Sequence, residues 1–403
     1  MAYRRRCIFV HGYDARGPDH YLPLLRRGAR IWAEREGRDV AVGDDAVDEH
    51  VARVEIVVSG EPDVVCSIEC LRWDRQARAT VPRGWARRLG GVRLAVDMVR
   101  LGVFGPLWRS GRPLALASVA HGLFTAAVTL AAIAAFGAAA AVALGASLPW
   151  LLLPLPFAAL AFAVTRHAGL WALRWVGAGM AHELAVREGD PLLASPHGRA
   201  LIAHLSAALV DDVDEAIVVA HCSGTRLAVS LLAEALARLP DGGRDRPVRL
   251  LTLAQPSMAV VARLAAAHGF RAHLRALARH RRLDWVDVSS PIDGSNAALV
   301  DPVRATFGSD AGGGARTFNA WFKASLEPET YAALRADRYA THFRYLAVPD
   351  RPDGRNLDLF DMLLRAQPAL ARYERPEETG PFYASRKVSP WTPLPTGAAT
   401  SKP

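Results

Sequence analysis

Short apolar runs, separated by stretches with helical spacing, fill both ends of the chain and predict an α/β fold. The runs have the length of buried strands and end in turn residues. They stand at positions 7–10, 64–74, 217–219, 248–254 and 283–288. After the third run, apolar residues recur at helical spacing, as in Leu227, Leu231 and Leu232. Strands that alternate with helices form a mostly parallel sheet covered by helices on both faces, and we expect that architecture.

The middle of the chain has a different pattern, because positions 114–164 contain no Asp, Glu, Lys or Arg. A helix needs about 20 residues to cross the ~30 Å hydrocarbon layer of a membrane. The run is therefore long enough for two crossings, with a turn at 145–149. A buried core hairpin is the alternative. So long an uncharged stretch is difficult to place in a soluble core, and we expect a transmembrane helical hairpin at about 114–164.

Basic residues flank this run on both sides. They are Arg100, Arg109 and Arg112 before it, and Arg166, Arg174 and Arg187 after it. Since basic flanks stay in the cytoplasm, both ends of the hairpin are expected on the cytoplasmic side, where the two ends of the chain can form one domain. The segment 1–6 is charged and lacks the apolar region of a cleaved signal peptide. We expect a multi-pass protein of the cell membrane.

These patterns divide the chain into four segments. Residues 1–85 and 191–375 are expected to form the two parts of one α/β domain. Residues 86–190 are expected to be a membrane insertion with juxtamembrane helices. Residues 376–403 are rich in Pro, Thr, Ser and Gly, which is typical of a disordered tail.

The net charge of +9 suggests nucleic acid as an alternative partner. The chain has neither a basic-aromatic module nor zinc-ligand spacing, so we expect no nucleic-acid binding. Four cysteines give no convincing disulfide framework, which fits the reducing cytoplasm. Because no metal-ligand cluster and no phosphate-binding glycine loop appear, we expect neither a metal nor a cofactor.

The third apolar run leads into a turn over positions 220–224 that is typical of a strand–turn–helix connection. Such a turn pushes its central side chain out over the sheet edge and leaves room only for small residues two positions away. With Cys222 at the centre, those positions hold Ala220 and Gly224. With Ser223 at the centre, they would hold a histidine and a threonine. We therefore expect Cys222 to be a nucleophile; a buried structural cysteine is the alternative.

This turn resembles the nucleophile elbow of the α/β-hydrolase superfamily, and the amino terminus carries a second likeness. The run 7–10 ends in His11-Gly12, like the oxyanion loop of these enzymes. In the family, the residue after His-Gly and the residue after the nucleophile donate backbone N–H groups to the developing oxyanion. The resemblance implies that Tyr13 and Ser223 are these donors.

The same family places its acid and its histidine after the nucleophile, in that order. The run 283–288 leads into a Pro/Gly turn where the family carries its acid, so the resemblance implies Asp293. Asp287 inside the run and Asp301 further along are alternatives, and an Asx turn is the purely structural reading of Asp293. His342 stands in a late loop whose sequence resembles the His-x-x-Tyr-Leu loop of lipase-like members, which implies the catalytic histidine.

The resemblance covers about residues 1–80 and 195–370 and departs from the family twice. Ala220 replaces a glycine, and Cys222 replaces the serine, as in dienelactone hydrolases and polyhydroxyalkanoate synthases. A thiol paired with histidine ionises near neutral pH and attacks carbonyl carbon well. We expect a membrane-anchored hydrolase of an ester or thioester, with a lipid or acyl substrate. A cysteine-dependent acyltransferase and a non-catalytic membrane scaffold are the alternatives.

Overall fold

The chain divides into two compact units. A computed structural model describes residues 1–80, 92–93, 95–110, 112–145, 147–171, 176–186, 189–239, 246–256, 258–262, 267–308, 312–352 and 356–374. The first unit joins Met1–Ala79 to the chain from Val186 on, and the second unit is Thr80–Ala185. The predicted tail, 376–403, lies outside the described residues.

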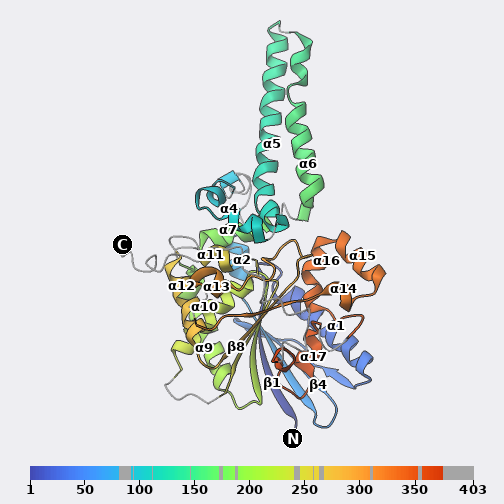
Figure 1. Ribbon diagram of the computed structural model, residues 1–403, viewed down its shortest axis with the longest axis vertical. Helices are drawn as coiled ribbons and strands as arrows, with labels where there is room; N and C mark the ends of the chain where they lie inside the picture. Colours follow the sequence, from blue (N-terminus) through green and yellow to red (C-terminus); the bar gives the residue numbers. More distant parts are fainter. Residues whose placement is uncertain are drawn as a thin grey trace. The chain divides into compact units, whose positions relative to one another are not determined.

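Nine strands in the described part of the first unit form one sheet (Figure 1). They are β1 (Tyr3–Val10), β2 (Val40–Val42), β3 (Ala46–Val47), β4 (Val51–Val58), β5 (Val64–Leu71), β6 (Glu215–His221), β7 (Val248–Leu253), β8 (Leu283–Ser289) and β9 (Arg316–Asn319). The strand order is β2-β4-β5-β1-β6-β7-β8-β9, with β3 also paired to β4. The strands from β5 to β9 along this order are parallel to one another, whereas β4 is antiparallel to β2, β3 and β5.

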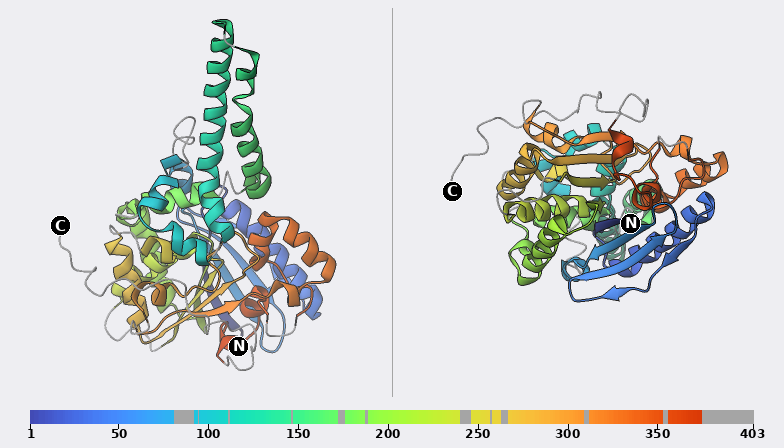
Figure 2. Two further views of the ribbon diagram at one scale, coloured as in Figure 1. Left: turned by 45° about the horizontal axis from the view of Figure 1, so that its top comes forward. Right: turned by 90° about the horizontal axis from the view of Figure 1, so that it is seen from below.

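Helices cover both faces of this sheet, because parallel strands need crossover connections (Figure 2). On one face α1 (Pro18–Glu36) and α17 (Leu359–Leu364) contact each other and β5. On the other, α9 (Pro196–Val210) and α10 (Gly224–Ala237) contact each other and β1, and α12 (His268–Arg279) packs on α10. The predicted mixed α/β class, with a mostly parallel sheet between helices, is confirmed.

Shorter helices complete the first unit. They are α2 (Asp74–Thr80), α8 (Pro191–Ala194), α11 (Met258–Ala262), α13 (Pro302–Phe307), α14 (Phe322–Ser325), α15 (Pro328–Ala336) and α16 (Arg338–Phe343).

The centre of the sheet sets where the candidate site lies. The segments 7–10 of β1 and 217–220 of β6 are at most 1% exposed, as expected of strands buried on both faces. The two strands are parallel neighbours, with Val10 opposite Ala220. The chain therefore leaves both strands at the same sheet edge, and His11 and Cys222 follow there.

The second unit is helical in its described part. It contains α4 (Phe104–Ser110), α5 (Arg112–Ala143), a 3₁₀ turn η1 (Leu148–Leu152), α6 (Leu155–Trp171) and α7 (Gly177–Ala185). Helices α5 and α6 lie side by side as a hairpin (Figures 1 and 2). By length and composition one helix, Leu114–Ala143, could cross a membrane, whereas the apolar part of α6, Leu155–Val164, is shorter. Two membrane crossings therefore stay a prediction.

Candidate active site

Cys222 occupies a tight turn between β6 and α10. Its φ of 56° lies in the left-handed region that residues with a side chain rarely adopt, whereas Ser223 has an ordinary φ of −61°. The Cys222 N–H donates to the carbonyl of Leu253 in β7 at 2.9 Å, and the Thr225 N–H donates to the carbonyl of Cys222 at 3.0 Å. The strained residue of the turn is the cysteine, and strain held by the surrounding structure is common at functional sites.

Two glycines allow the turn to meet the His-Gly loop, residues 11–13. A Cβ on Gly224 would lie 2.2 Å from the carbonyl oxygen of His11, closer than real Cβ contacts allow. A Cβ on Gly12 would lie 2.9 Å from the Cβ of Cys222 and 3.5 Å from its sulfur. The His-Gly loop therefore lies directly against the thiol.

His342 lies between Cys222 and Asp293. Its Nδ1 is 2.9 Å from Oδ2 of Asp293, and neither side chain is exposed. Cys222 is close enough to His342 to act on its charge, and because Nδ1 faces Asp293, we place the thiol on the Nε2 side of the ring. Burial alone would lower the pKa of His342, but the charges of Asp293 and Cys222 and the hydrogen bond to Asp293 raise it to about 10. The structure thus brings the three predicted catalytic side chains together.

Several hydrogen-bond donors hold the carboxylate of Asp293. Its Oδ1 accepts the N–H of Ser295 at 2.9 Å, and its Oδ2 accepts from Nδ2 of Asn296 at 2.9 Å in addition to His342. Nδ2 of Asn296 also donates to the hydroxyl of Tyr345 at 2.7 Å. The Asx turn weighed as an alternative is therefore present, and the same carboxylate holds the histidine. The sequence analysis did not identify Asn296, which has no local signature.

The two alternative acids are engaged elsewhere. Oδ1 of Asp287 accepts from Oγ1 of Thr252 on the neighbouring strand at 2.7 Å, and burial raises the pKa of Asp287 to about 8. Asp301 caps α13, where it accepts the N–H of Val303 at 2.9 Å. Both carboxylates thus have structural partners in the sheet and at a helix end.

Each of the two predicted oxyanion donors is a chain neighbour of a residue at the thiol. Ser223 directly precedes α10, where backbone N–H groups carry the positive end of the helix dipole. Tyr13 directly follows Gly12, the residue packed on Cys222, and it is 4% exposed. Their role in binding an oxyanion stays a prediction.

His11, which directly follows β1 at this sheet edge, is a structural residue. Its ring stacks on Trp73 with centroids 5.2 Å apart, and Nε1 of Trp73 donates to its carbonyl oxygen at 3.0 Å. Burial lowers the pKa of His11 to about 4, so the ring is neutral near pH 7. Its Nδ1 donates to the carbonyl of Gly12 at 2.7 Å and fixes the His-Gly loop.

One expectation about the local structure is wrong. His342 is expected in a loop but lies in the short helix α16. Asp337 caps this helix by accepting two backbone N–H groups of its first turn at 2.9 and 3.0 Å. A six-residue helix is too short to produce a hydrophobic period, so only its cap could have indicated it.

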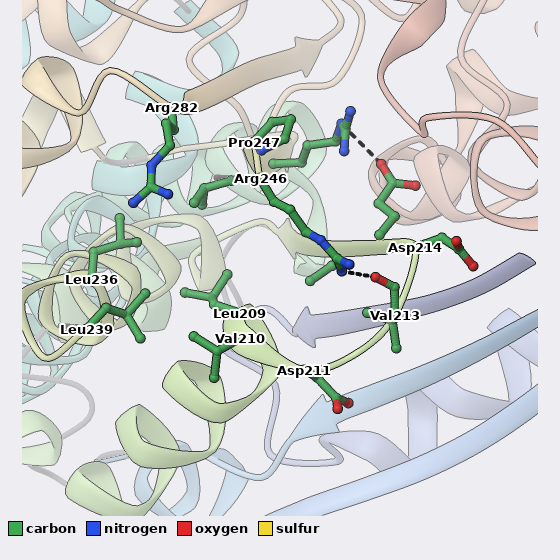
Figure 3. Close-up of a pocket in the computed structure, with 14 residues that line it drawn as sticks. Leu209, Val210, Asp211, Val213, Asp214, Leu236, Leu239, Arg246, Pro247 and Arg282 are labelled. Atoms are coloured by element: carbon green, nitrogen blue, oxygen red, sulfur yellow. Dashed lines mark hydrogen bonds and ion pairs between the residues drawn. The ribbon is translucent and has the colours of Figure 1, made fainter. Parts of the chain in front are cut away.

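The pocket in Figure 3 belongs to the opposite edge of the sheet. It holds about 170 Å³ and is lined by the first residues of β6 and β7, Glu215 and Val248, and by the ends of α9 and α10. Cys222 follows the other end of β6, so this pocket is not part of the candidate site. Among the described residues, no group of three or more His, Cys, Asp or Glu side chains is placed to hold a metal ion.

Comparisons of the chain with protein-family models, with curated proteins and with solved structures find no match.

Proposed function

We propose that the chain is a membrane-anchored enzyme of α/β-hydrolase type that cleaves an ester or thioester of a lipid or acyl substrate. One observation carries the proposal: Cys222 occupies a left-handed turn at the sheet edge, and His342, whose pKa the charge of Cys222 raises, has Nδ1 2.9 Å from Oδ2 of Asp293. A nucleophile, a base and a group that orients the base are the parts that covalent acyl chemistry requires. Their order in the chain, nucleophile then acid then histidine, is that of the superfamily.

In the acylation step, the sulfur of Cys222 attacks the carbonyl carbon of the substrate and His342 holds the thiol proton. Collapse of the tetrahedral intermediate forms a thioester bond to Cys222. The bond to the leaving alcohol or thiol breaks, and that group departs with the proton from Nε2 of His342. Asp293, hydrogen-bonded to Nδ1, orients the ring and stabilises the imidazolium.

In the deacylation step, water attacks the thioester while His342 takes its proton. The carboxylic acid leaves, and the proton returns to the sulfur of Cys222. In both steps the carbonyl oxygen becomes negative, and we assign its stabilisation to the N–H groups of Tyr13 and Ser223. Two such preorganised donors are typically worth a few kcal/mol of barrier.

The other cysteines support a special role for Cys222. Cys7, Cys66 and Cys70 lie inside strands β1 and β5 and are fully buried. Burial raises the pKa of Cys66 to about 12. These three side chains behave as small packing residues, whereas Cys222 has a histidine beside it.

The side-chain distribution of the hairpin supports membrane insertion. Along α5 beyond Ala126, the buried positions are alanines: Ala127, Ala134 and Ala138. Large apolar side chains point outward instead, with Phe136 80% exposed and, in α6, Phe162 69% exposed. Small residues between helices and large apolar residues outside are typical of helices that pack in lipid, since a soluble hairpin would bury its largest side chains.

The experiment that tests the catalytic proposal is acyl trapping. The full chain in detergent is incubated with p-nitrophenyl butanoate, and the acylated residue is located by mass spectrometry. We expect an acyl group on Cys222 that is lost in Cys222→Ala. Ser223→Ala, which keeps the backbone N–H, and Cys70→Ala, which removes another buried thiol, should both still be acylated.

Each outcome decides between the functions. Equal labelling of the wild type and Cys222→Ala would contradict the proposal and favour the non-catalytic scaffold. Release of butanoate in water alone supports hydrolysis. An acyl-enzyme that persists in water and is discharged only by an added alcohol or amine would contradict hydrolysis and favour an acyltransferase.

A further inference from the structure

One buried hydroxyl connects the chain segments that form the candidate site. Tyr21 in α1 is fully enclosed, and its oxygen accepts the N–H of Gly12 at 3.2 Å. The same oxygen lies 3.3 Å from Nδ1 of His221, the last residue of β6. Nε2 of His221 lies 3.0 Å from the carbonyl oxygen of His342. This series of contacts thus links the His-Gly loop, through Tyr21, to His221, the residue before Cys222, and then to the backbone of His342, the candidate base.

The contacts fix the direction of each hydrogen bond. The carbonyl oxygen of His342 can only accept, so Nε2 of His221 carries a hydrogen. Burial, followed by the nearby charge of His342, lowers the pKa of His221 well below its ordinary value, so the ring is neutral and Nδ1 accepts from the Tyr21 hydroxyl. The oxygen of Tyr21 accepts from Gly12. Successive bonds of this kind polarise and strengthen one another in a low-dielectric interior.

Neither residue is suited to exchange a proton with substrate. Both ring nitrogens of His221 are engaged, and burial raises the pKa of Tyr21 well above its ordinary value. His221 instead packs on the base, with its centroid 4.8 Å from that of His342, and Tyr21 packs on the next residue, with its centroid 5.7 Å from that of Phe343. A shift of His221 would therefore move the ring and the backbone of His342.

We propose that Tyr21 and His221 are positioning residues, which hold His342 and the His-Gly loop in reach of Cys222 without touching the reacting atoms. This inference rests on the proposed function of the same site. It adds to the triad two residues that make no hydrogen bond to the thiol, and it assigns the histidine before the nucleophile a role apart from acid–base chemistry.

The test removes the hydrogen bonds one at a time. Tyr21→Phe removes only the hydroxyl, His221→Leu removes both bonds, and His221→Gln keeps an N–H that can reach the carbonyl of His342. Because one ordinary hydrogen bond is worth about a tenfold change in rate, we expect kcat for p-nitrophenyl butanoate to fall about tenfold in Tyr21→Phe. It should fall about 100-fold in His221→Leu and recover in part in His221→Gln, with KM within about twofold throughout.

Tyr373→Phe is the matched control. Tyr373 is also a buried tyrosine of the first unit, and its ring packs at a tilt against Phe318, on the last strand of the sheet, with centroids 4.5 Å apart. Removing this hydroxyl should leave kcat unchanged. Thermal unfolding of every variant identifies any loss of folded protein, and the rates are compared at a temperature where all are folded.

A second measurement works without turnover. The rate at which iodoacetamide alkylates Cys222 depends on the contact of its sulfur with His342. In Tyr21→Phe and His221→Leu the rate should move toward that of His342→Gln. Wild-type rates in both folded variants would overturn the positioning role, whereas a wild type that alkylates at Cys222 but forms no acyl adduct would refute the proposed function alone. A kcat that falls only with the folded fraction would also overturn the positioning role.

Discussion

Oδ2 of Asp293 lies 2.9 Å from Nδ1 of His342, and both side chains are closed off from solvent. A buried carboxylate is tolerated only when its charge is paired and its oxygens are hydrogen-bonded. Ser295 and Asn296 supply the remaining bonds. The carboxylate is therefore fixed on one side by its own loop, and it can orient the imidazole toward Cys222 on the other.

Asp293→Asn should reduce kcat by about 100-fold or more, because the amide cannot stabilise an imidazolium and can favour the wrong tautomer of His342. The measurement is steady-state hydrolysis of p-nitrophenyl butanoate. Asp287→Asn is the matched control, since this acid hydrogen-bonds Thr252 and belongs to β8. The assignment of the acid is wrong if the two variants lose activity in the opposite order.

Asp287 should also make the fold less stable as the pH rises. Burial raises its pKa to about 8 in the folded chain, whereas an unfolded aspartate has a pKa of 3.8. Between these values the folded chain binds the proton that the unfolded chain releases, so the free energy of unfolding falls with increasing pH. Asp287→Asn, which keeps an oxygen for Thr252, should remove this part of the slope. Urea unfolding at several pH values from 4 to 8 measures it; identical slopes for the two proteins would contradict the assignment.

His342 acts in a higher pH window. Its pKa is raised to about 10 in the folded chain, against 6.5 as the ordinary value. A raised folded pKa means that the stabilisation is complete below about pH 6.5 and is lost as the pH rises toward 10. The difference in unfolding free energy between the wild type and His342→Gln should therefore be largest near pH 6 and shrink toward pH 10. A difference that grows with pH would show that the imidazolium is not held by Asp293 and Cys222.

Gly224→Ala should destabilise the fold by about 2 kcal/mol or more, because the new Cβ would lie 2.2 Å from the carbonyl oxygen of His11 and force the turn away from β1. Loss of acylation at Cys222 should accompany it. Gly269→Ala is the control: no atom lies within 4 Å of its added Cβ, so stability should change by less than about 1 kcal/mol. Chemical denaturation of both variants checks the difference, and a Gly224→Ala protein with wild-type stability would show that the turn has room.

The sequence predicted those parts of the fold that have a local cause. Segments such as 7–10 and 217–220 are continuous apolar runs because both faces of their strands are buried, and the turn at Cys222 requires Gly224 for a steric reason. The antiparallel edge formed by β2, β3 and β4 was missed. Val40–Val42 and Ala46–Val47 are too short to show a period, and only their pairing with β4 makes them strands.

The supporting residues of the site could not be predicted in the same way. Tyr21 and His221 are 200 positions apart and meet only because β1 and β6 are neighbours in the sheet. Asn296 is likewise defined by its contact with Asp293 and Tyr345 rather than by a motif. Local sequence carries the nucleophile and the order of the triad, whereas the hydrogen bonds around them arise from topology.

The hairpin should hold the full chain in the membrane. We expect the wild type to sediment with membranes and to remain there in about 1 M NaCl, which screens contacts between charges but leaves apolar insertion intact. Detergent should release it. Phe136→Lys places a charge on the outward face of α5, within the apolar span, where a lysine costs at most about 3 kcal/mol. This variant should shift to the soluble fraction, whereas Phe136→Leu should behave as the wild type.

Reporter insertions test directly whether the hairpin crosses the membrane twice. A reporter inserted after residue 147, between α5 and α6, should lie outside the cytoplasm, and reporters at either end of the chain should lie inside. A reporter at 147 that stays cytoplasmic would contradict two crossings. If α5 crosses and α6 does not, the reporters at 147 and at the C-terminus would both lie outside, which would fit the shorter apolar length of Leu155–Val164. Release of the wild type by salt alone would contradict insertion altogether, because an interface made only of arginine contacts weakens as the ionic strength rises.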